Sequence, residues 1–378
     1  MDFELSEEQK IIQATIRRFA QEELAPVAED LDIAEKFPWK IFQRMAELGL
    51  FGMMLPAEYG GSGSDELSLA IAIEEIAQAC ASTADILDSA AIIGIIPIYH
   101  YGNEEQKQRL LPALAKGERI SSYAITEPDA GSDIGAIKAR AVRDGDDYIL
   151  NGQKTFITCG NVCDISIVFA GIPELAPRGM TAFIVEKEMP GFSRGKKFKK
   201  LGMHAATNAE LFFEDCRVPA ANRLGKEGKG IKIALSALDH GRIGIAAQSV
   251  GIAQAVLDKS VEYSKTRIQF GAPISKYQAI AWKLADMATG IEAARFLYYN
   301  AAHLADRGKL FTKNAAMAKL YASELAMRAS TWGIQIFGGY GYMMEYPMQR
   351  YFRDAKLTEI YEGTSEVQRM VISRAVLS

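Results

Sequence analysis

The sequence lacks the features that would place it among disulfide-rich, membrane-spanning or nucleic-acid-binding proteins. It has only four cysteines in 378 residues, and Cys159 and Cys163 have no second pair with which to hold a metal ion. The formal net charge of -4 gives no basic field for nucleic acid. The longest apolar stretch, residues 90–97, is far too short to cross a bilayer. We therefore expect reduced, structural thiols, no metal site and no membrane insertion.

Leader peptides and common nucleotide motifs are also missing. The chain begins with the acidic stretch Met1–Glu4 and shows no apolar leader. This favours a cytoplasmic protein, although a mature mitochondrial matrix protein would look the same. No G-x-G-x-x-G follows a strand and opens a helix, and the sequence contains neither a P-loop nor a G-x-S-x-G elbow. Any cofactor site must therefore be built in another way.

The pattern that is present changes twice along the chain. Up to about residue 118 the apolar spacing is helical, beginning with a capping box at Ser6–Gln9. Alternating stretches and a turn at Asp144–Asp147 then predict strands, and long helical patterns return from about residue 230. The expected fold is mainly α with a central antiparallel β domain. We place an N-terminal helical domain at 1–118, the β domain at 119–228 and a C-terminal helical domain at 229–378.

The most informative stretch is Ile360–Ser365, near the C-terminus. It places Glu362 between an aromatic residue and a glycine, and a helix start follows at Glu366. A carboxylate beside an aromatic ring tends to lose solvation, which raises its pKa and suits it to take a proton. By itself, such a segment is also typical of an ordinary helix start.

Four further segments combine polar groups with glycine or aromatic residues. Residues 123–133 leave a strand for a polar loop, and residues 151–158 place an aromatic ring and a hydroxyl on one strand face. Both segments suit the flanks of a flat heteroaromatic ring. Residues 267–273 put a cation at the end of a long helix, which suits a pyrophosphate, and residues 335–341 are glycine-rich after a helix. Each segment is equally typical of a structural turn, strand or helix end.

Together and in this order, these segments resemble the acyl-CoA dehydrogenase family over essentially the whole chain. Residues 238–242 and 350–354 belong to the same resemblance. It implies three domains, which are an N-terminal helical domain, an antiparallel β-barrel-like domain and a C-terminal four-helix bundle. It also implies FAD as cofactor, an acyl-CoA substrate, an electron-transferring flavoprotein as electron acceptor and usually a homotetramer. In the family a carboxylate takes the α-proton of the acyl-CoA while the β-hydrogen leaves as hydride to flavin N5. Glu362 matches that base.

The resemblance also implies binding residues. The thioester carbonyl oxygen is expected to be stabilised by the flavin ribityl hydroxyl and the backbone N–H of Glu362. In the family, contacts to the FAD pyrophosphate and adenosine come largely from a neighbouring subunit. The positions that match FAD contacts are Tyr123, Ile125, Thr126, Gly131, Ser132, Phe156, Ile157, Thr158, Arg267, Phe270, Gln278, Gln335, Gly338, Gly339, Thr364 and Glu366. The positions that match contacts to the CoA part or the thioester are Ser132, Asp239, Arg242, Tyr361 and Gly363.

Some positions distinguish this chain from other branches of the family. Certain branches carry the base on the helix around residue 241, but here that residue is Gly241, so only Glu362 can serve. The pattern from Asp239 to Arg242 looks most like short-chain, butyryl-CoA-type members. Phe156 stands where many members have Trp, and Cys159 where Asn is frequent.

The sharpest departure concerns the helix expected to line the acyl pocket. It carries Asp85, which we expect at an exposed helix start, and Asp88, which precedes an apolar run ending at Pro97. A buried carboxylate is costly unless it is paired or functional. Asp88 is therefore either an ion-paired or water-bound acid, or a second acid/base for a cyclic acyl group such as cyclohexane- or cyclohexene-carboxyl-CoA.

The favoured interpretation is FAD-dependent α,β-dehydrogenation of a short-chain or cyclic acyl-CoA to the 2-enoyl-CoA. Acyl-CoA oxidases are usually much longer chains, and a nitroalkane-oxidising relative would typically carry Asp in place of Glu362. A non-catalytic FAD-binding subunit of an electron-transfer complex would lack the base. A flavin-free helical scaffold would leave Arg267 and the Thr126 loop without a shared purpose.

Overall fold

The computed structural model describes residues 4–177 and 179–377. Its N-terminal part is helical, as expected, and the predicted capping box is confirmed. The Gln9 N–H donates to Ser6 Oγ at 3.2 Å, and the Ser6 N–H donates to Gln9 Oε1 at 3.0 Å. The helices of this part are α1 (Glu7–Phe19), α2 (Ala28–Ala34), α3 (Trp39–Glu47), α4 (Glu66–Ala79), α5 (Ala81–Asp88), α6 (Ile96–Tyr101) and α7 (Glu104–Ala115).

Helix α5 differs most from the expectation. It follows α4 after the single residue Cys80 and continues into a π-helix at Ser89–Ile93. Asp85 is only 3% exposed, so the prediction that it lies at an exposed helix start is wrong. The reason is that α5 packs against α4 and the long helix α8 (Gly230–Thr266) from its first turn onward. Pro97 does not end this run either; it lies in the first turn of α6, where its missing N–H is tolerated.

The segment Ala81–Tyr101 needs comment because it is 21 residues long with a mean hydropathy of 1.5. By length and composition alone it is apolar enough to cross a membrane. In the structure 94% of that window is buried inside the protein. The segment is therefore packed as a core helix is.

The middle part of the described chain is an open eight-stranded sheet, in the order β6-β7-β3-β2-β4-β5-β8 with β1 beside β4. It is not a closed barrel. The predicted hairpin is β2 and β3, paired antiparallel across the turn at Gly145. Most pairings are antiparallel, but β4 pairs parallel with β1 and with the first residue of β2. The strands are β1 (Ser121–Ala124), β2 (Arg140–Asp144), β3 (Asp147–Thr158), β4 (Ile165–Gly171), β5 (Met180–Glu186), β6 (Phe192–Lys197), β7 (Asn208–Pro219) and β8 (Arg223–Leu224).

The C-terminal part is again helical. The two helical patterns expected at 231–238 and 243–267 form the single helix α8, because Gly241 between them does not interrupt it. A small hairpin of β9 (Ile268–Gln269) and β10 (Ala272–Pro273) follows α8. The remaining helices are α9 (Gln278–Asp306), α10 (Thr312–Phe337), α11 (Met348–Thr358) and α12 (Ser365–Leu377).

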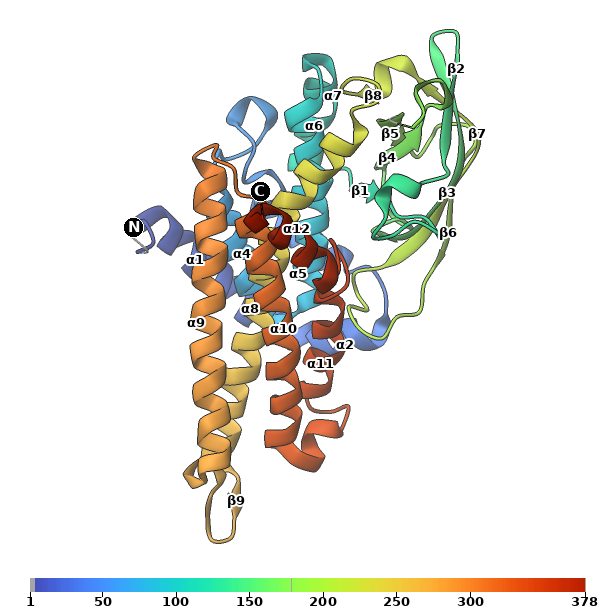
Figure 1. Cartoon of the computed structure of the whole chain (residues 1–378). Helices are drawn as coiled ribbons and strands as arrows, with labels where there is room; N and C mark the ends of the chain where they lie inside the picture. The colour runs from blue at the N-terminus through green and yellow to red at the C-terminus, as the bar shows by residue number, and fades with distance from the viewer. Residues whose placement is uncertain (1–3, 178, 378) are drawn as a thin grey trace.

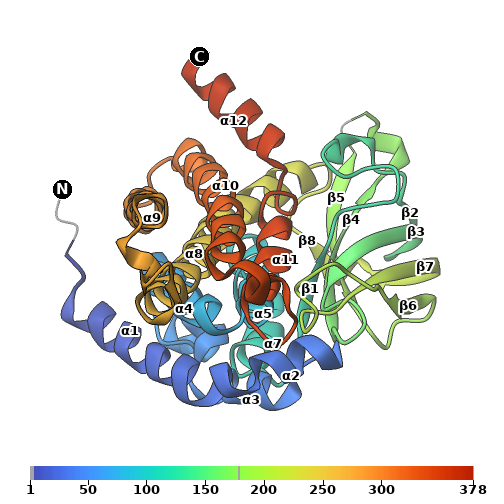
Figure 2. The same cartoon turned by 90° about the horizontal axis from the view of Figure 1, so that it is seen from below.

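The arrangement of these parts positions the candidate site. The long helices α8, α9 and α10 run side by side, with the β9–β10 hairpin at one end, and the sheet lies beside their other end (Figure 1). Seen from below, α1, α2 and α3 follow one edge of the molecule, while α12 projects from the opposite side (Figure 2). The sheet meets the helices mainly through β5, which contacts α8, and β1, which contacts the π-helix after α5.

Candidate active site

Glu362 lies in the tight link between α11 and α12. Its φ is +52°, which is uncommon for a residue with a side chain, and Gly363 follows with φ +97°. Lys319 Nζ donates to the Gly363 carbonyl oxygen at 2.8 Å. The Gln368 side-chain amide donates to the carbonyl oxygens of Glu362 at 3.1 Å and of Gly363 at 2.9 Å. These two side chains hold the turn, and α12 begins at Ser365, one residue before the expected start.

The turn directs the Glu362 carboxyl onto the backbone of α8. A Cβ placed on Gly241 would lie 2.2 Å from Glu362 Oε2, so a side chain at residue 241 would displace the carboxyl of Glu362. One turn further along the same helix, a Cβ on Gly244 would lie 1.8 Å from Asp88 Oδ1. The two carboxyls therefore press against the same glycine face of α8, since residues three apart are neighbours on a helix surface.

Burial dominates the electrostatics of this carboxyl pair. It raises the pKa of Glu362 to about 7, against a hydrogen bond from Asp88 and the positive charges of Arg242 and Lys319. Burial, followed by the charge of Glu362, raises the pKa of Asp88 well above its usual range. As two carboxylates, Asp88 Oδ1 and Glu362 Oε2 would have no donor within the described part of the chain. Burial thus favours the protonated form of both carboxyls, and a proton on one of them would supply the missing donor.

The residues expected at the CoA part and the thioester lie on α8 and in the link. Arg242 Nη1 donates to Asp239 Oδ1 at 2.6 Å, and Asp239 Oδ2 accepts from the Thr312 hydroxyl at 2.5 Å. Arg242 is 3% exposed, and its Nε has no partner in the described ranges. The Tyr361 hydroxyl donates to the Gln248 side chain on α8. This network fixes α8 and α10 around Glu362, whereas Ser132 lies apart, exposed in the loop after β1.

A buried ion pair joins the two strand segments expected to flank the flavin. Lys154 Nζ donates to Glu127 Oε1 at 2.8 Å and to the Ile125 carbonyl at 3.0 Å. Glu127 also accepts from the backbone N–H groups of Lys138 at 2.6 Å and Ala139 at 3.0 Å. Burial lowers the pKa of Lys154 to about 8. The pair locks the loop after β1 to β3, and it is a feature that the sequence patterns did not reveal.

The side chains of those two segments point in different directions. Phe156 has φ +59° at a register shift of β3, and its ring is 64% exposed. Asn208 Nδ2 donates to the Phe156 carbonyl and to Thr158 Oγ1, both at 3.0 Å. The Ile157 side chain is buried in the core of the β domain, so only its backbone can contact a ligand on the face where Phe156 is exposed. Tyr123 is buried as well, with its hydroxyl donating to the Ala234 carbonyl at 3.2 Å. Ile125 is buried, Thr126 half-buried and Gly131 exposed.

A second set of predicted residues lies at the other end of the long helices. A cavity of 520 Å³ there brings together Arg267, Gly338 and Gly339 with aromatic side chains. No atom lies within 4 Å of a Cβ placed on either glycine, so the space beside them is open. Phe270, at the tip of the β9–β10 hairpin, is 96% exposed. Gln278 and Gln335, which are close in sequence to Arg267 and Gly338, are exposed. Thr364 lies in the link before α12, and Glu366 lies in the first turn of that helix. One chain therefore does not bring the two sets together (Figure 1).

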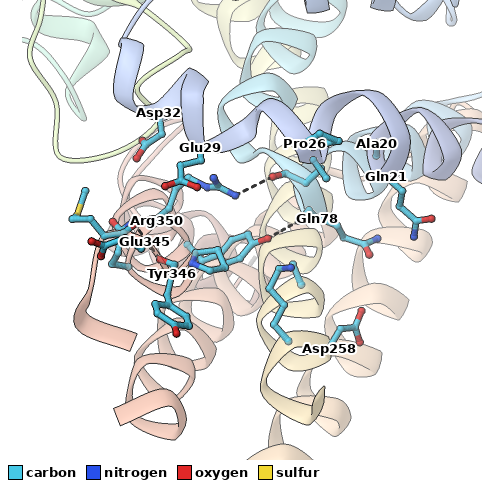
Figure 3. A pocket seen from close by; sticks show the side chains of 18 of the residues that line it. Ala20, Gln21, Pro26, Glu29, Asp32, Gln78, Asp258, Glu345, Tyr346 and Arg350 are labelled. Carbon is cyan, nitrogen blue, oxygen red and sulfur yellow. Dashed lines mark hydrogen bonds between the residues drawn. The ribbon is translucent and has the colours of Figure 1, made fainter. Parts of the chain in front are cut away.

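A larger cavity, of 560 Å³, lies between the N-terminal helices and α11 (Figure 3). Its walls include Arg350 and Tyr351, whose hydroxyl donates to the Gln78 carbonyl at 2.9 Å. None of the predicted site residues lines it. Its remaining charged residues are mostly acidic: Glu29, Asp32, Glu75, Asp258 and Glu345. This cavity is separate from the site around Glu362.

Several residues of the site escaped the sequence analysis. Lys319 and Gln368, which hold the Glu362 turn, are fully buried. Lys319 is a lone cation within an alanine-rich helical pattern, and this was the signal that could have drawn attention to it. Gly244 gave no such signal, because its role depends on Asp88 arriving from another helix.

Comparison with known proteins now identifies the family. Models of the acyl-CoA dehydrogenase N-terminal, middle and C-terminal domains match residues 6–118, 122–216 and 228–377. The chain belongs to the acyl-CoA dehydrogenase family. It is 51% identical to "Acryloyl-CoA reductase (NADH)" of Anaerotignum propionicum, over 100% of this chain and 96% of that protein.

Solved structures agree with the family match. Butyryl-CoA dehydrogenase from Megasphaera elsdenii superimposes with a TM-score of 0.98 at 46% identity, covering 100% of both chains. A chain in a structure described as "Electron transferring flavoprotein of Acidaminococcus fermentans" superimposes with a TM-score of 0.98 at 49% identity, again over 100% of both chains. The protein is an acyl-CoA dehydrogenase, an oxidoreductase, with the fold expected from the sequence.

Members of this family bind FAD, and the residues of this chain fit that cofactor. The open space beside Gly338 and Gly339, with Arg267 at its edge, suits a pyrophosphate and adenosine. The exposed Phe156 ring and the backbone of β3 suit one face of a flavin. FAD is the cofactor, and it supplies the redox chemistry that the side chains cannot.

Proposed function

We propose that this acyl-CoA dehydrogenase converts a short-chain or cyclic acyl-CoA to the 2-enoyl-CoA, with Glu362 as the base that removes the α-proton. The chief support is the position of the Glu362 carboxyl. It is pressed against the bare backbone of Gly241, and burial raises its pKa to about 7. A carboxyl with such a pKa is partly ionised at neutral pH and accepts a proton more readily than an exposed one.

The chain's own residues orient the substrate and handle the proton. FAD, when bound, supplies the acceptor for the hydride that leaves the β-carbon. Removal of the α-proton develops negative charge on the thioester oxygen, which needs a hydrogen-bond donor. In this proposal the backbone N–H of Glu362 is one such donor, while Asp239 and Arg242 contact the CoA part. The rigid ion pair and hydrogen bonds of those two residues keep them oriented before substrate arrives.

A cyclic acyl substrate is the alternative within the same class, and Asp88 is the observation that favours it. Its carboxyl is 1% exposed, lies beside Glu362 and has no cationic partner in the described ranges. A buried acid of this kind suits a second proton-transfer step, at a ring carbon further from the thioester. If Asp88→Asn turned over every linear and cyclic acyl-CoA as the wild type does, this role would be excluded.

The proposed assembly is a homotetramer that passes electrons to an electron-transferring flavoprotein. A second subunit is needed because Arg267, Phe270 and Gln335 lie at the far end of the helices from Glu362. The likeness to a chain in a structure described as an electron-transferring flavoprotein supports that acceptor. The relative named as an acryloyl-CoA reductase shows why enoyl-CoA reduction should be assayed beside dehydrogenation.

The first experiment is an anaerobic titration of the purified yellow protein with butyryl-CoA, cyclohexanecarboxyl-CoA and cyclohexenecarboxyl-CoA. Bleaching of the flavin absorbance by one of them, and its absence in Glu362→Gln, supports the proposal. The ranking of the three rates distinguishes the linear from the cyclic substrate class. A flavoprotein that none of these and no other acyl-CoA bleaches would instead be a non-catalytic FAD-binding subunit.

A further inference from the structure

Lys319 is a buried cation that the proposed reaction does not yet use. It lies on α10 and is 0% exposed, and its Nζ donates to the Gly363 carbonyl oxygen at 2.8 Å. Within the described ranges no carboxylate forms an ion pair with it. Burying an ammonium group without a counter-charge is unfavourable, so a residue of this kind calls for a function.

The charges around Lys319 point to Glu362. Burial lowers the pKa of Lys319 to about 7, and the charge of Glu362 opposes that effect more than any other group does. The charged groups that act on the Glu362 carboxyl are Asp85 and Asp88 from α5, Arg242 from α8 and Lys319 from α10. Arg242 already forms an ion pair with Asp239 at 2.6 Å. Lys319 is therefore the cation near Glu362 that has no carboxylate of its own in the described chain.

The backbone geometry adds a second observation. Glu362 and Gly363 both have positive φ, of +52° and +97°. A left-handed conformation at a residue with a side chain persists only where surrounding contacts impose it. Lys319 bonds the carbonyl that ends this turn, so one side chain both fixes the turn and brings a positive charge to it.

We propose that Lys319 is the positioning residue of the base: it holds the Glu362–Gly363 turn and supplies the charge that favours the ionised form of Glu362. Gln368 shows why the charge matters. Its amide donates to the same Gly363 carbonyl at 2.9 Å, so a neutral donor already fits there. A lysine adds what a second amide would not, which is a positive charge in a low-dielectric site.

This inference rests on the proposed role of Glu362, and two variants test it. Lys319→Met removes the donor and the charge, whereas Lys319→Gln keeps a donor and removes the charge. The rate of anaerobic flavin bleaching by acyl-CoA is measured against pH for both. Removing a nearby positive charge raises the pKa of a carboxyl, so the acid limb of the profile moves up by about one pH unit. At a fixed pH below the limb, the bleaching rate of each variant is therefore about tenfold lower than that of the wild type.

Matched controls separate the effect of the positive charge of Lys319 from the effect of its hydrogen bond to the Gly363 carbonyl. Gln368→Met removes the other donor to Gly363 without changing charge, and it lowers the rate with the limb left in place. Lys313→Met replaces an exposed lysine of the same helix and leaves the profile unchanged. Lys319→Met or Lys319→Gln, folded and holding FAD, with a wild-type acid limb would overturn the inference.

A readout without turnover keeps the two proposals distinguishable. The protonation of Glu362 is followed by infrared difference spectroscopy, with Glu362→Gln identifying its carboxyl band. A higher titration midpoint in Lys319→Gln supports the inference even if no acyl-CoA bleaches the flavin. An unchanged midpoint rejects it while leaving the proposed reaction intact.

Discussion

The carboxyl of Glu362 lies against the bare backbone of Gly241, in the space that a side chain on residue 241 would enter. A Cβ there would lie 2.2 Å from Oε2 and 2.7 Å from Oε1 of Glu362. Glu362 reaches this place from a link 121 residues further along the chain, by way of a left-handed turn. The conformation of Glu362 and the identity of residue 241 are therefore coupled.

Gly241→Ala is expected to displace the carboxyl and lower the rate of acyl-CoA dehydrogenation about 100-fold, since displacing a reacting group by 1 Å has that order of effect. Stopped-flow flavin bleaching measures it. Gly251→Ala is the matched control, because a Cβ on that glycine of α8 would lie 2.4 Å from the Glu74 carbonyl oxygen and away from Glu362. The control is expected to lose stability but to bleach normally once folded. Equal rates in Gly241→Ala and the wild type would contradict the coupling.

Asp88 is expected to set the pH at which the base works. Burial raises the pKa of Glu362, and a hydrogen bond from Asp88 acts against that effect. Asp88→Ala removes that donor, so the acid limb of the bleaching rate moves to higher pH. Asp88→Asn keeps a donor and is expected to leave the limb near its wild-type position. The two pH profiles are compared with the same acyl-CoA, and coincident limbs would show that the hydrogen bond is absent.

The buried pair of Lys154 and Glu127 is expected to hold the flavin-facing segments together. Lys154→Met leaves Glu127 buried without its cation, which lowers the free energy of unfolding by about 3–5 kcal/mol. Urea unfolding and FAD retention on gel filtration measure the two consequences. Lys138→Met is the control, because its ion pair with Asp129 is exposed on both sides. Lys138→Met is expected to have the stability and FAD retention of the wild type. Equal free energies of unfolding for the two variants would refute the structural role of the Lys154–Glu127 pair.

His240 is expected to make stability depend on pH. Its Nδ1 lies 2.8 Å from Glu66 Oε2 and joins α8 to the first residue of α4. Burial lowers the pKa of His240, but the Glu66 carboxylate outweighs burial and the pKa is raised. The stabilisation is then fully present below the unfolded pKa of about 6.5 and is lost as pH rises through the folded pKa.

The measurement is urea unfolding of the wild type and of His240→Gln across that pH range. The difference between the two free energies of unfolding is expected to shrink as pH rises. Comparison with the variant removes the contributions of Glu362, Asp88 and Asp306, which titrate in both proteins. A difference that stays constant with pH would mean that the pKa of His240 is the same in the folded and unfolded states, and a difference that grows with pH would mean that His240 is neutral in the folded state.

Much of the fold follows from local pattern. The capping box at Ser6, the hairpin around Gly145 and the long helices α9 and α10 are short-range features, because helix caps, turns and apolar periodicity act over a few residues. The prediction failed at Asp85 and at Pro97. A helix of eight residues has no periodicity strong enough to show which neighbours will cover it.

The sequence alone determined the order of helical, β and helical parts and singled out Glu362, because these depend on residue types within single segments. The tertiary structure decided what suits Glu362 to its proposed role as the base. Lys319, Gly241 and Asp88 reach it from three different helices, 43, 121 and 274 residues away in sequence. Their effects on its pKa and conformation arise from burial and from distances across packed helices. No local pattern of amino acids encodes such distances; packing alone sets them.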